Sequence, residues 1–282
     1  IKLTAADAAM ADYFGYSVAI DGNTIVVGAY GDGSGAVTAG EGSVYVFRTT
    51  NGLTYSQVAK FSAADTAYGD WFGYSVAIDG DTIVVGAPYK SSRTGAAYVF
   101  RTSDGGATYV EVAKLTASDA AAYDNFGRSV AIAGSTIVVG ASGDDDAGLM
   151  SGSAYIFSTT DGWTTHTEIK LTAADAAMAD YFGYSVAIDG NTIVVGAYGD
   201  GSGAVTAGEG SVYVFRTTNG LTYSQVAKFS AADTAYGDWF GYSVAIDGDT
   251  IVVGAPYKSS RTGAAYVFRT HDGGATYVEL AK

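Results

Sequence analysis

Five pairs of aspartates, with four residues between the two members of each pair, precede five Phe-Gly dipeptides in this chain of 282 residues. Convergent carboxylates and loop carbonyls are the ligands that a hard cation such as calcium requires. Aspartates in turns also accept backbone N–H groups and hold a loop in shape, and repetition suits that structural role at least as well. Both interpretations stay open, with calcium as the candidate cation and no cofactor required. The candidate metal ligands are Asp7, Asp12, Asp65, Asp70, Asp119, Asp124, Asp175, Asp180, Asp233 and Asp238.

The residue directly before each Phe-Gly dipeptide is aromatic in four of the five cases. Aromatic faces stack on sugars and on peptide side chains, so these positions are candidate ligand contacts. The alternative is that the rings pack against a neighbouring part of the protein, which is expected for most of the 22 tyrosines of the chain. The five positions are Tyr13, Trp71, Asn125, Tyr181 and Trp239.

Catalytic groups are scarce. The chain has no cysteine, which excludes thiolate catalysis, disulfides and zinc bound by cysteine. A metallohydrolase needs several histidine ligands, and His166 and His271 are the two histidines, far apart in the sequence. The serines lack a G-x-S-x-G motif with a partner histidine. We therefore predict that the chain is not an enzyme.

Self-similarity is the strongest signal for the fold. Residues 169–282 repeat residues 1–114 with two changes, His271 in place of Ser103 and Leu280 in place of Val112. The period of 168 residues itself contains three related units, A, B and C, so that the order along the chain is A-B-C-A-B. The unit boundaries are 3–60, 61–114, 115–170, 171–228 and 229–282.

Each unit has the pattern of four short antiparallel strands. In the first unit we predict strands at 16–20, 24–29, 43–47 and 55–60, with Asp21-Gly22 as a tight hairpin signal. The alanine-rich stretch 5–11 is predicted to be a loop or a single turn. Solenoid units usually have one to three strands and atypical caps. The sequence therefore predicts an all-β protein, a single-domain β-propeller over 1–282 with five four-stranded antiparallel blades.

This architecture places two sets of loops on one rim. The loops between blades hold the aspartate pairs, and the loops between the second and third strands are expected to emerge beside them. The second set adds further carboxylates to the same rim: Asp32, Asp144, Asp145, Asp146 and Asp200. The repeated arginines end the third strand, at the opposite rim, so they do not converge as a sialidase-like site requires: Arg48, Arg101, Arg216 and Arg269.

Three segments of the second unit carry a family resemblance. The run that starts at Phe72-Gly73, the run Val85-Gly86-Ala87-Pro88 and the segment 95–100 together resemble the FG-GAP repeat of integrin α-subunit propellers and of bacterial and algal surface proteins. The resemblance recurs once per unit. It implies an extracellular or cell-surface propeller for adhesion, with ligand contacts on the rim of the inter-blade loops.

The chain departs from that family pattern in two ways. Integrin-type blades often have a D-x-D-x-D-G calcium loop between strands one and two, whereas the segments here, such as Asp21-Gly22-Asn23, are too short to enclose the ion. The family usually has seven blades and not five. A weaker similarity links Thr102–Tyr109 to the Asp-box of sialidase-like propellers, which is a structural turn in that family.

The predicted function is a non-catalytic extracellular module for adhesion or for glycan or protein recognition. The net charge of −14 argues against nucleic acid and anionic lipid as partners. No apolar stretch is long enough to predict membrane insertion. The alternative is a purely structural or engineered symmetric repeat scaffold without a ligand, which the near-identical copies would suit.

Overall fold

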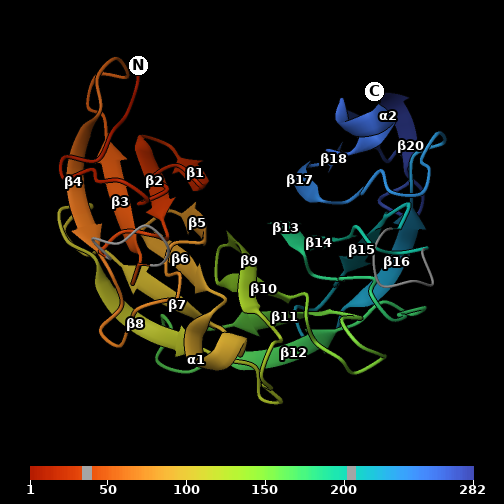
Figure 1. Ribbon diagram of the computed structural model, residues 1–282, viewed down its shortest axis with the longest axis horizontal. Helices are drawn as coiled ribbons and strands as arrows, with labels where there is room; N and C mark the ends of the chain where they lie inside the picture. The colour runs from red at the N-terminus through yellow and green to blue at the C-terminus, as the bar shows by residue number, and fades with distance from the viewer. Residues whose placement is uncertain (34–39, 202–207) are drawn as a thin grey trace. The chain divides into compact units, whose positions relative to one another are not determined.

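The computed structural model describes residues 1–33, 40–201 and 208–282. It contains five four-stranded antiparallel sheets in which the strands follow one another in chain order (Figure 1). This confirms the predicted all-β class and the five propeller blades. The strands are β1 (Ser17–Asp21), β2 (Thr24–Ala29), β3 (Ser43–Arg48) and β4 (Ser56–Phe61); β5 (Ser75–Asp79), β6 (Thr82–Ala87), β7 (Ala96–Arg101) and β8 (Val110–Leu115); β9 (Phe126–Ala133), β10 (Thr136–Ala141), β11 (Ser153–Ser158) and β12 (Thr167–Leu171); β13 (Ser185–Asp189), β14 (Thr192–Ala197), β15 (Ser211–Arg216) and β16 (Ser224–Phe229); and β17 (Ser243–Asp247), β18 (Thr250–Ala255), β19 (Ala264–Arg269) and β20 (Val278–Ala281).

The chain divides into two compact units. Unit 1 consists of residues 1–137 and 158–167, and unit 2 consists of residues 138–157 and 168–282. The helical segments are single turns, α1 (Lys90–Arg93) in unit 1 and α2 (Lys258–Arg261) in unit 2. Residues 5–11 form turns, as predicted. In the described part of the chain, no helix has the length and apolar character needed to cross a membrane.

The second strand of the sheet contributes most to the core in the best-covered repeats. Successive side chains of a strand point to opposite faces, so a strand is fully buried only when both faces are covered. All six residues of β6 and of β14 are buried. Within unit 1 strand β5 packs beside β1, and within unit 2 strand β17 packs beside β13. The apolar repeat Thr-Ile-Val-Val-Gly-Ala forms the second strand, and β2, β6 and β14 each contact the first strand of the following sheet.

The Phe-Gly dipeptides of the second to fifth repeats connect each repeat to the one before it. The Phe72 ring has no exposed surface and lies edge-on to Tyr98 and Phe100, with ring centroids 5.6 and 5.8 Å away. Gly73 has φ +86°, and a Cβ there would lie 2.6 Å from the carbonyl oxygen of Ser43 in the preceding sheet. A side chain would not fit, because the two main chains are already in contact.

The two-residue hairpins between the first and second strands are also confirmed. Asp21 pairs with Thr24, which leaves Gly22 and Asn23 as the turn. Gly22 has φ +51°, a conformation that glycine adopts at little cost.

Truncation of the buried phenylalanine should destabilise the protein strongly. We expect Phe72→Ala to lower the free energy of unfolding by roughly 3–5 kcal/mol, because it removes a fully buried ring and leaves a cavity. Val112→Ala is the control, since Val112 is 37% exposed on β8. Denaturant unfolding measures both. A loss for Phe72→Ala no larger than that for Val112→Ala would contradict the assigned role of Phe72.

Candidate functional site

The second aspartate of each pair shapes the loop that contains it. All five are buried, with 2–7% of the residue exposed. In each case one carboxylate oxygen accepts the N–H of the alanine three residues earlier, at 2.6–2.7 Å. These carboxylates therefore hold the loop in shape, which is the role that the sequence analysis gave as the alternative to metal binding. The residues are Asp12, Asp70, Asp124, Asp180 and Asp238. Burial raises the pKa of Asp180 to about 6, against the opposing effect of its hydrogen bond from Ala177.

The first aspartate of the pair binds a tyrosine and a lysine of its own repeat. Asp7 accepts the hydroxyl of Tyr45 at 3.0 Å and the ammonium of Lys60 at 2.6 Å. The side chain of Asp7 stays half exposed. The same trio recurs in three further repeats as Asp65, Tyr98 and Lys114; Asp175, Tyr213 and Lys228; and Asp233, Tyr266 and Lys282. Asp119, in the remaining pair, is exposed.

The lysine also joins the two loops of the rim. Lys60 lies 2.7 Å from the carboxylate of Asp32, a buried residue of the loop after β2, so one ammonium bridges both loops. Lys228 bridges Asp175 and Asp200 in the same way. These contacts confirm the prediction that the two sets of loops emerge on one rim. In the third repeat, Lys170 pairs with Asp144 and Asp146, at 2.9 and 2.5 Å.

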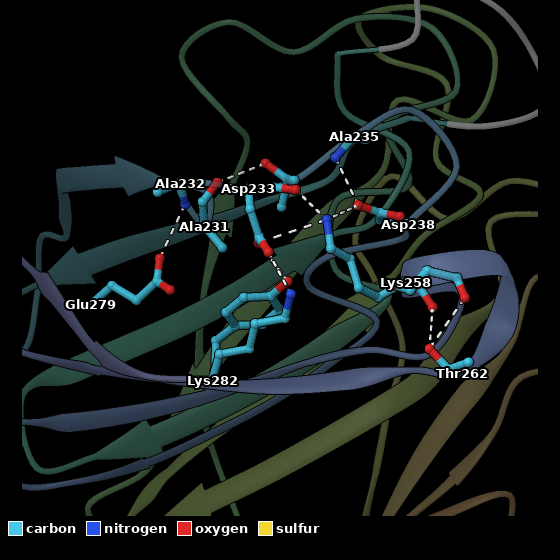
Figure 2. Close-up of polar contacts among 12 residues, drawn as sticks. Ala231, Ala232, Asp233, Ala235, Asp238, Lys258, Thr262, Glu279 and Lys282 are labelled. Atoms are coloured by element: carbon cyan, nitrogen blue, oxygen red, sulfur yellow. Dashed lines mark hydrogen bonds and ion pairs between the residues drawn. The ribbon is translucent and has the colours of Figure 1, made fainter.

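The B repeats add a second, buried lysine. Lys90 of α1 lies 2.8 Å from Asp70 and 3.6 Å from Asp65, so it holds both members of one pair. Figure 2 shows the equivalent arrangement in the last repeat, with Lys258 between Asp233 and Asp238 and Lys282 beside Asp233. Each aspartate pair of the B repeats is thus surrounded by ammonium groups of the same repeat.

These lysines lie between carboxylates of the rim and lower the pKa of some of them. The hydrogen bond from Lys60 holds the pKa of Asp7 below its ordinary value, and Lys282 and then Tyr266 lower the pKa of Asp233 to about 2. The carboxylates of the lysine-bound pairs are therefore compensated by ammonium groups of the same chain. Sequence reasoning missed these lysine partners of the aspartates. The available signal was a lysine at the same place in every unit: Lys60, Lys114, Lys170, Lys228 and Lys282.

The candidate ligand residues lie in clusters of rings. In unit 1 Tyr13 stacks on Tyr30, with centroids 4.8 Å apart, and Trp71 stacks on Tyr89 at 3.6 Å. Tyr30 and Trp71 are 5.0 Å apart and connect the two pairs. The cluster is completed by Tyr16 and Tyr74, whose hydroxyls share a 2.8 Å hydrogen bond. We call these six residues the unit 1 aromatic cluster: Tyr13, Tyr16, Tyr30, Trp71, Tyr74 and Tyr89.

The cluster is both packed and accessible. Tyr13 and Tyr16 are each 51% exposed, whereas Tyr74 is buried. The guanidinium of Arg93 lies 4.5 Å above the Tyr89 ring. The same arrangement forms the unit 2 aromatic cluster of Tyr181, Tyr184, Tyr198, Trp239, Tyr242 and Tyr257, with Arg261 over Tyr257. Asn125 takes no part in ring stacking, and its amide donates to the Tyr123 carbonyl at 2.6 Å.

Sequence reasoning found the residue before each Phe-Gly dipeptide but missed its stacking partners. Tyr30 and Tyr89 follow the second strand, at the start of the neighbouring loop. The available signal was an aromatic residue shortly after the Gly-Ala that ends this strand.

The opposite ends of the sheets hold the arginines and the Asp-box-like turns. Asp104 accepts the N–H groups of Ala107 and Thr108 at 2.9 and 3.0 Å and the Thr108 hydroxyl at 2.6 Å, which closes its turn. A Cβ on Gly106 of this turn would lie 2.7 Å from Nη1 of Arg48. Arg101 and Arg216 lie against other turns, at Gly162 and Gly274. Each of these three arginines therefore lies against a different turn, and Arg269 ends β19.

Comparison with protein families matches five segments of the chain to the FG-GAP repeat, at residues 1–47, 55–100, 109–157, 165–215 and 223–268. The chain belongs to the FG-GAP repeat family. The four matches after the first each run from the fourth strand of one sheet to the third strand of the next sheet. The match over 55–100, for example, runs from β4 to β7. A comparison with curated proteins found no match.

Calcium should leave the stability of this FG-GAP protein unchanged. We expect the same thermal midpoint in chelator and in millimolar calcium, because lysine ammonium groups already compensate the rim carboxylates. The double variant Lys60→Met and Lys228→Met frees Asp7, Asp32, Asp175 and Asp200, so its midpoint should rise with calcium. Differential scanning calorimetry measures both. A rise for the unmodified chain would show that the metal displaces the lysines.

Acid should weaken the same contacts. A lowered pKa in the folded state means that the Asp233 carboxylate stabilises the fold above its ordinary pKa of 3.8, and that this contribution is lost as the pH falls towards about 2. We expect the free energy of unfolding to decrease over that interval, and to decrease less steeply in Lys282→Met. Denaturant unfolding at a series of pH values measures the slopes. Equal slopes would contradict the role of Lys282.

Proposed function

We propose that the chain is a non-catalytic recognition module that binds an extracellular protein or glycan through the aromatic residues before its Phe-Gly dipeptides. The supporting observation is a backbone conformation. Tyr13, Trp71, Tyr181 and Trp239 have φ between +55° and +61°, a region that bulky side chains rarely adopt. Asn125 has φ +56° at the same position, and asparagine enters this region most easily among non-glycine residues. Aromatic residues occupy the other four positions despite the strain, which supports a role for the rings themselves.

The environment of these rings suits contact with a ligand. Tyrosine and tryptophan supply large contact area with few rotatable bonds, and together with arginine they are enriched at binding hot spots. In unit 1 the rings are already stacked and Arg93 lies beside them, so little conformational entropy would be lost on binding. Partial exposure of Tyr13 and Tyr16 leaves ring surface for a sugar or a peptide side chain.

Several observations support a non-catalytic role. His166 and His271 are exposed and lie in the turns before β12 and β20 of different sheets. Arg48, Arg101 and Arg216 each lie against a separate turn. The lysine-bound rim aspartates serve as ion-pair partners, and we propose that no cofactor is required. The extracellular setting is proposed from the family resemblance.

A structural scaffold without a ligand is the second candidate. It is favoured by the close stacking of Trp71 on Tyr89 at 3.6 Å, which uses one ring to hold two loops together. It is also favoured by the rim carboxylates, whose partners are groups of the same chain. In this case the aromatic residues would stabilise the junctions between repeats and bind nothing else.

Tryptophan fluorescence separates the two candidates. The chain has three tryptophans, of which Trp71 and Trp239 belong to the aromatic clusters and Trp163 is 3% exposed in a turn of another sheet. We expect a ligand identified on a glycan array or among extracellular-matrix proteins to change the emission of the first two. The double variant Trp71→Asn and Trp239→Asn should lose binding and keep its thermal midpoint, because asparagine fits this backbone conformation as Asn125 does.

Trp163→Phe is the matched control and should bind as the unmodified chain does. Undiminished binding by the double asparagine variant would contradict the proposed site. Absence of binding on both ligand panels would favour the scaffold.

A further inference from the structure

A groove lies between the sheets of the fourth and fifth repeats, at the ends that hold the Asp-box-like turns. It has a volume of about 680 Å³ and is lined in part by Asn191, Arg216, Thr218, Val226 and Gly274. All of its lining residues belong to unit 2, so unit 2 alone sets its shape. None of them is acidic, although the chain has a net charge of −14. The residues that line the groove therefore do not repel an anion.

The guanidinium of Arg216 is positioned in this groove by the turn of the next repeat. A Cβ on Gly274 would lie 3.0 Å from Nη1 and 3.1 Å from Cδ of Arg216, so the arginine fills the space that a side chain there would take. The Gly274 N–H donates to the hydroxyl of Thr270 at 2.8 Å, which fixes the turn. Arg216 is half-buried, and it has no hydrogen bond or ion pair with another described residue. Its planar donor fork is therefore available to a carboxylate, which it would bind through two parallel hydrogen bonds.

Two polar side chains beside Arg216 are also available. The amide of Asn191 and the hydroxyl of Thr218 are exposed, and within the described part of the chain neither side chain has a hydrogen bond. Both groups donate and accept hydrogen bonds, as the hydroxyls of a sugar do. Val226, 38% exposed, adds an apolar wall that suits the C–H face of a sugar ring. A few convergent polar groups beside apolar surface are typical of a small-molecule site.

Unit 1 has the same residues at its equivalent junction, between the first and second repeats. Asn23, Arg48, Thr50 and Val58 occupy the corresponding positions. A Cβ on Gly106 would lie 2.7 Å from Nη1 and 3.1 Å from Cδ of Arg48, so this arginine lies against its turn as Arg216 does. Val58 is 39% exposed, close to the value for its counterpart. The chain therefore has two copies of the arrangement, one in each compact unit.

Acidic residues determine the side from which an anion approaches. On the other side of Arg216, a second groove of about 410 Å³ includes Asp189 and Asp249. Asp189 accepts the N–H of Gly248 at 2.6 Å. Because like charges repel, these carboxylates favour an approach along the groove that Thr218 and Val226 line.

The junction between the second and third repeats differs at the position of the amide. Asp81 stands there, where the A repeats have Asn23 and Asn191. Arg101 lies against the next turn, since a Cβ on Gly162 would be 2.8 Å from its Nη1. A carboxylate in place of the amide repels an anionic ligand. We therefore expect binding at the two junctions with asparagine and not at the junction with aspartate.

We propose that each of the two grooves binds an acidic sugar, such as a uronic acid residue, through its carboxylate. The guanidinium of Arg216 or Arg48 takes the carboxylate, the asparagine amide and the threonine hydroxyl take ring hydroxyls, and the valine contacts the C–H face of the ring. One guanidinium in a chain of net charge −14 suits a singly charged carboxylate better than a phosphate. The proposal does not depend on the function proposed above, because these grooves lie at the ends of the sheets opposite to the aromatic clusters.

The test is a saturation-transfer NMR titration of the full chain with methyl glucuronide, and with methyl glucoside as the neutral sugar of the same shape. We expect saturable binding of the glucuronide, and binding of the glucoside that is weaker by at least about tenfold, because the hydrogen bonds to a charged group are lost. The double variant Arg48→Gln and Arg216→Gln should lose affinity for the glucuronide to the same extent. Arg101→Gln is the matched control and should bind as the unmodified chain does.

A second double variant changes charge and keeps shape. Asn23→Asp and Asn191→Asp reproduce the residue that the chain already has at Asp81, so the fold should be retained, and circular dichroism checks this. We expect this variant also to bind the glucuronide at least about tenfold more weakly, because each new carboxylate lies beside the arginine that binds the ligand.

Three outcomes would overturn the proposal. The first is equal binding of the glucuronide and the glucoside, or no binding of either. The second is undiminished binding by either double variant, or an equal loss in Arg101→Gln. The third is binding of acetate or of an acidic peptide as tight as that of the glucuronide, because the sugar would then not be recognised. The variant Trp71→Asn and Trp239→Asn should bind the glucuronide normally, which separates this site from the aromatic clusters.

Discussion

Where one repeat meets the next within a compact unit, the main chains of the two repeats come into direct contact. A Cβ on Gly28 would lie 2.0 Å from the Gly73 carbonyl oxygen, and one on Gly42 would lie 1.9 Å from that of Phe72. Glycines on both sides permit this approach, and the phenylalanine beside them fills the space behind it. The spacing of the sheets in each unit depends on this contact, because a larger residue at these positions would push the repeats apart.

The loop that delivers the Phe-Gly dipeptide explains the composition of the rim. To bring the Phe-Gly dipeptide into place, the residue before the dipeptide adopts a positive φ, and a buried aspartate holds the turn by accepting a backbone N–H. A buried carboxylate raises the free energy of the fold unless it is hydrogen-bonded or paired. In the B repeats Lys90 and Lys258 supply that pairing, and in the A repeats Lys60 and Lys228 pair the buried Asp32 and Asp200. In the B repeats the aspartate that shapes the turn is therefore also the ion-pair partner of the buried lysine.

This arrangement also bears on the function that we propose for the rim. The carboxylates that suggested a cation site are in large part engaged with ammonium and hydroxyl groups of the same repeat. Tyr13 and Tyr16, each 51% exposed, keep ring surface for the external partner that we propose. This difference is why the proposed function rests on the rings and on the arginine beside them, and not on the carboxylates.

Much of the fold follows from local sequence. The five-fold repeat, the alternating strands, the two-residue hairpins and the buried phenylalanines all rest on patterns shorter than one repeat, and backbone geometry makes such patterns specific. The partners of the rim residues do not follow in this way. Lys60 and Asp7 are 53 residues apart, and nothing in either local sequence shows that they meet. The strained backbone of Trp71 likewise comes from the junction that its loop must reach.

The two B repeats show most directly what only tertiary structure decides. Val84 and Val252 lie in the same run of residues and in strands with the same pairing register, yet one is fully buried and the other is 40% exposed. The sequence by itself determines that each forms a strand with an apolar face, because hydrogen bonding and side-chain alternation are local to the repeat. Whether that face is covered depends on which other repeat packs against it, and burial of apolar surface is a property of the pair.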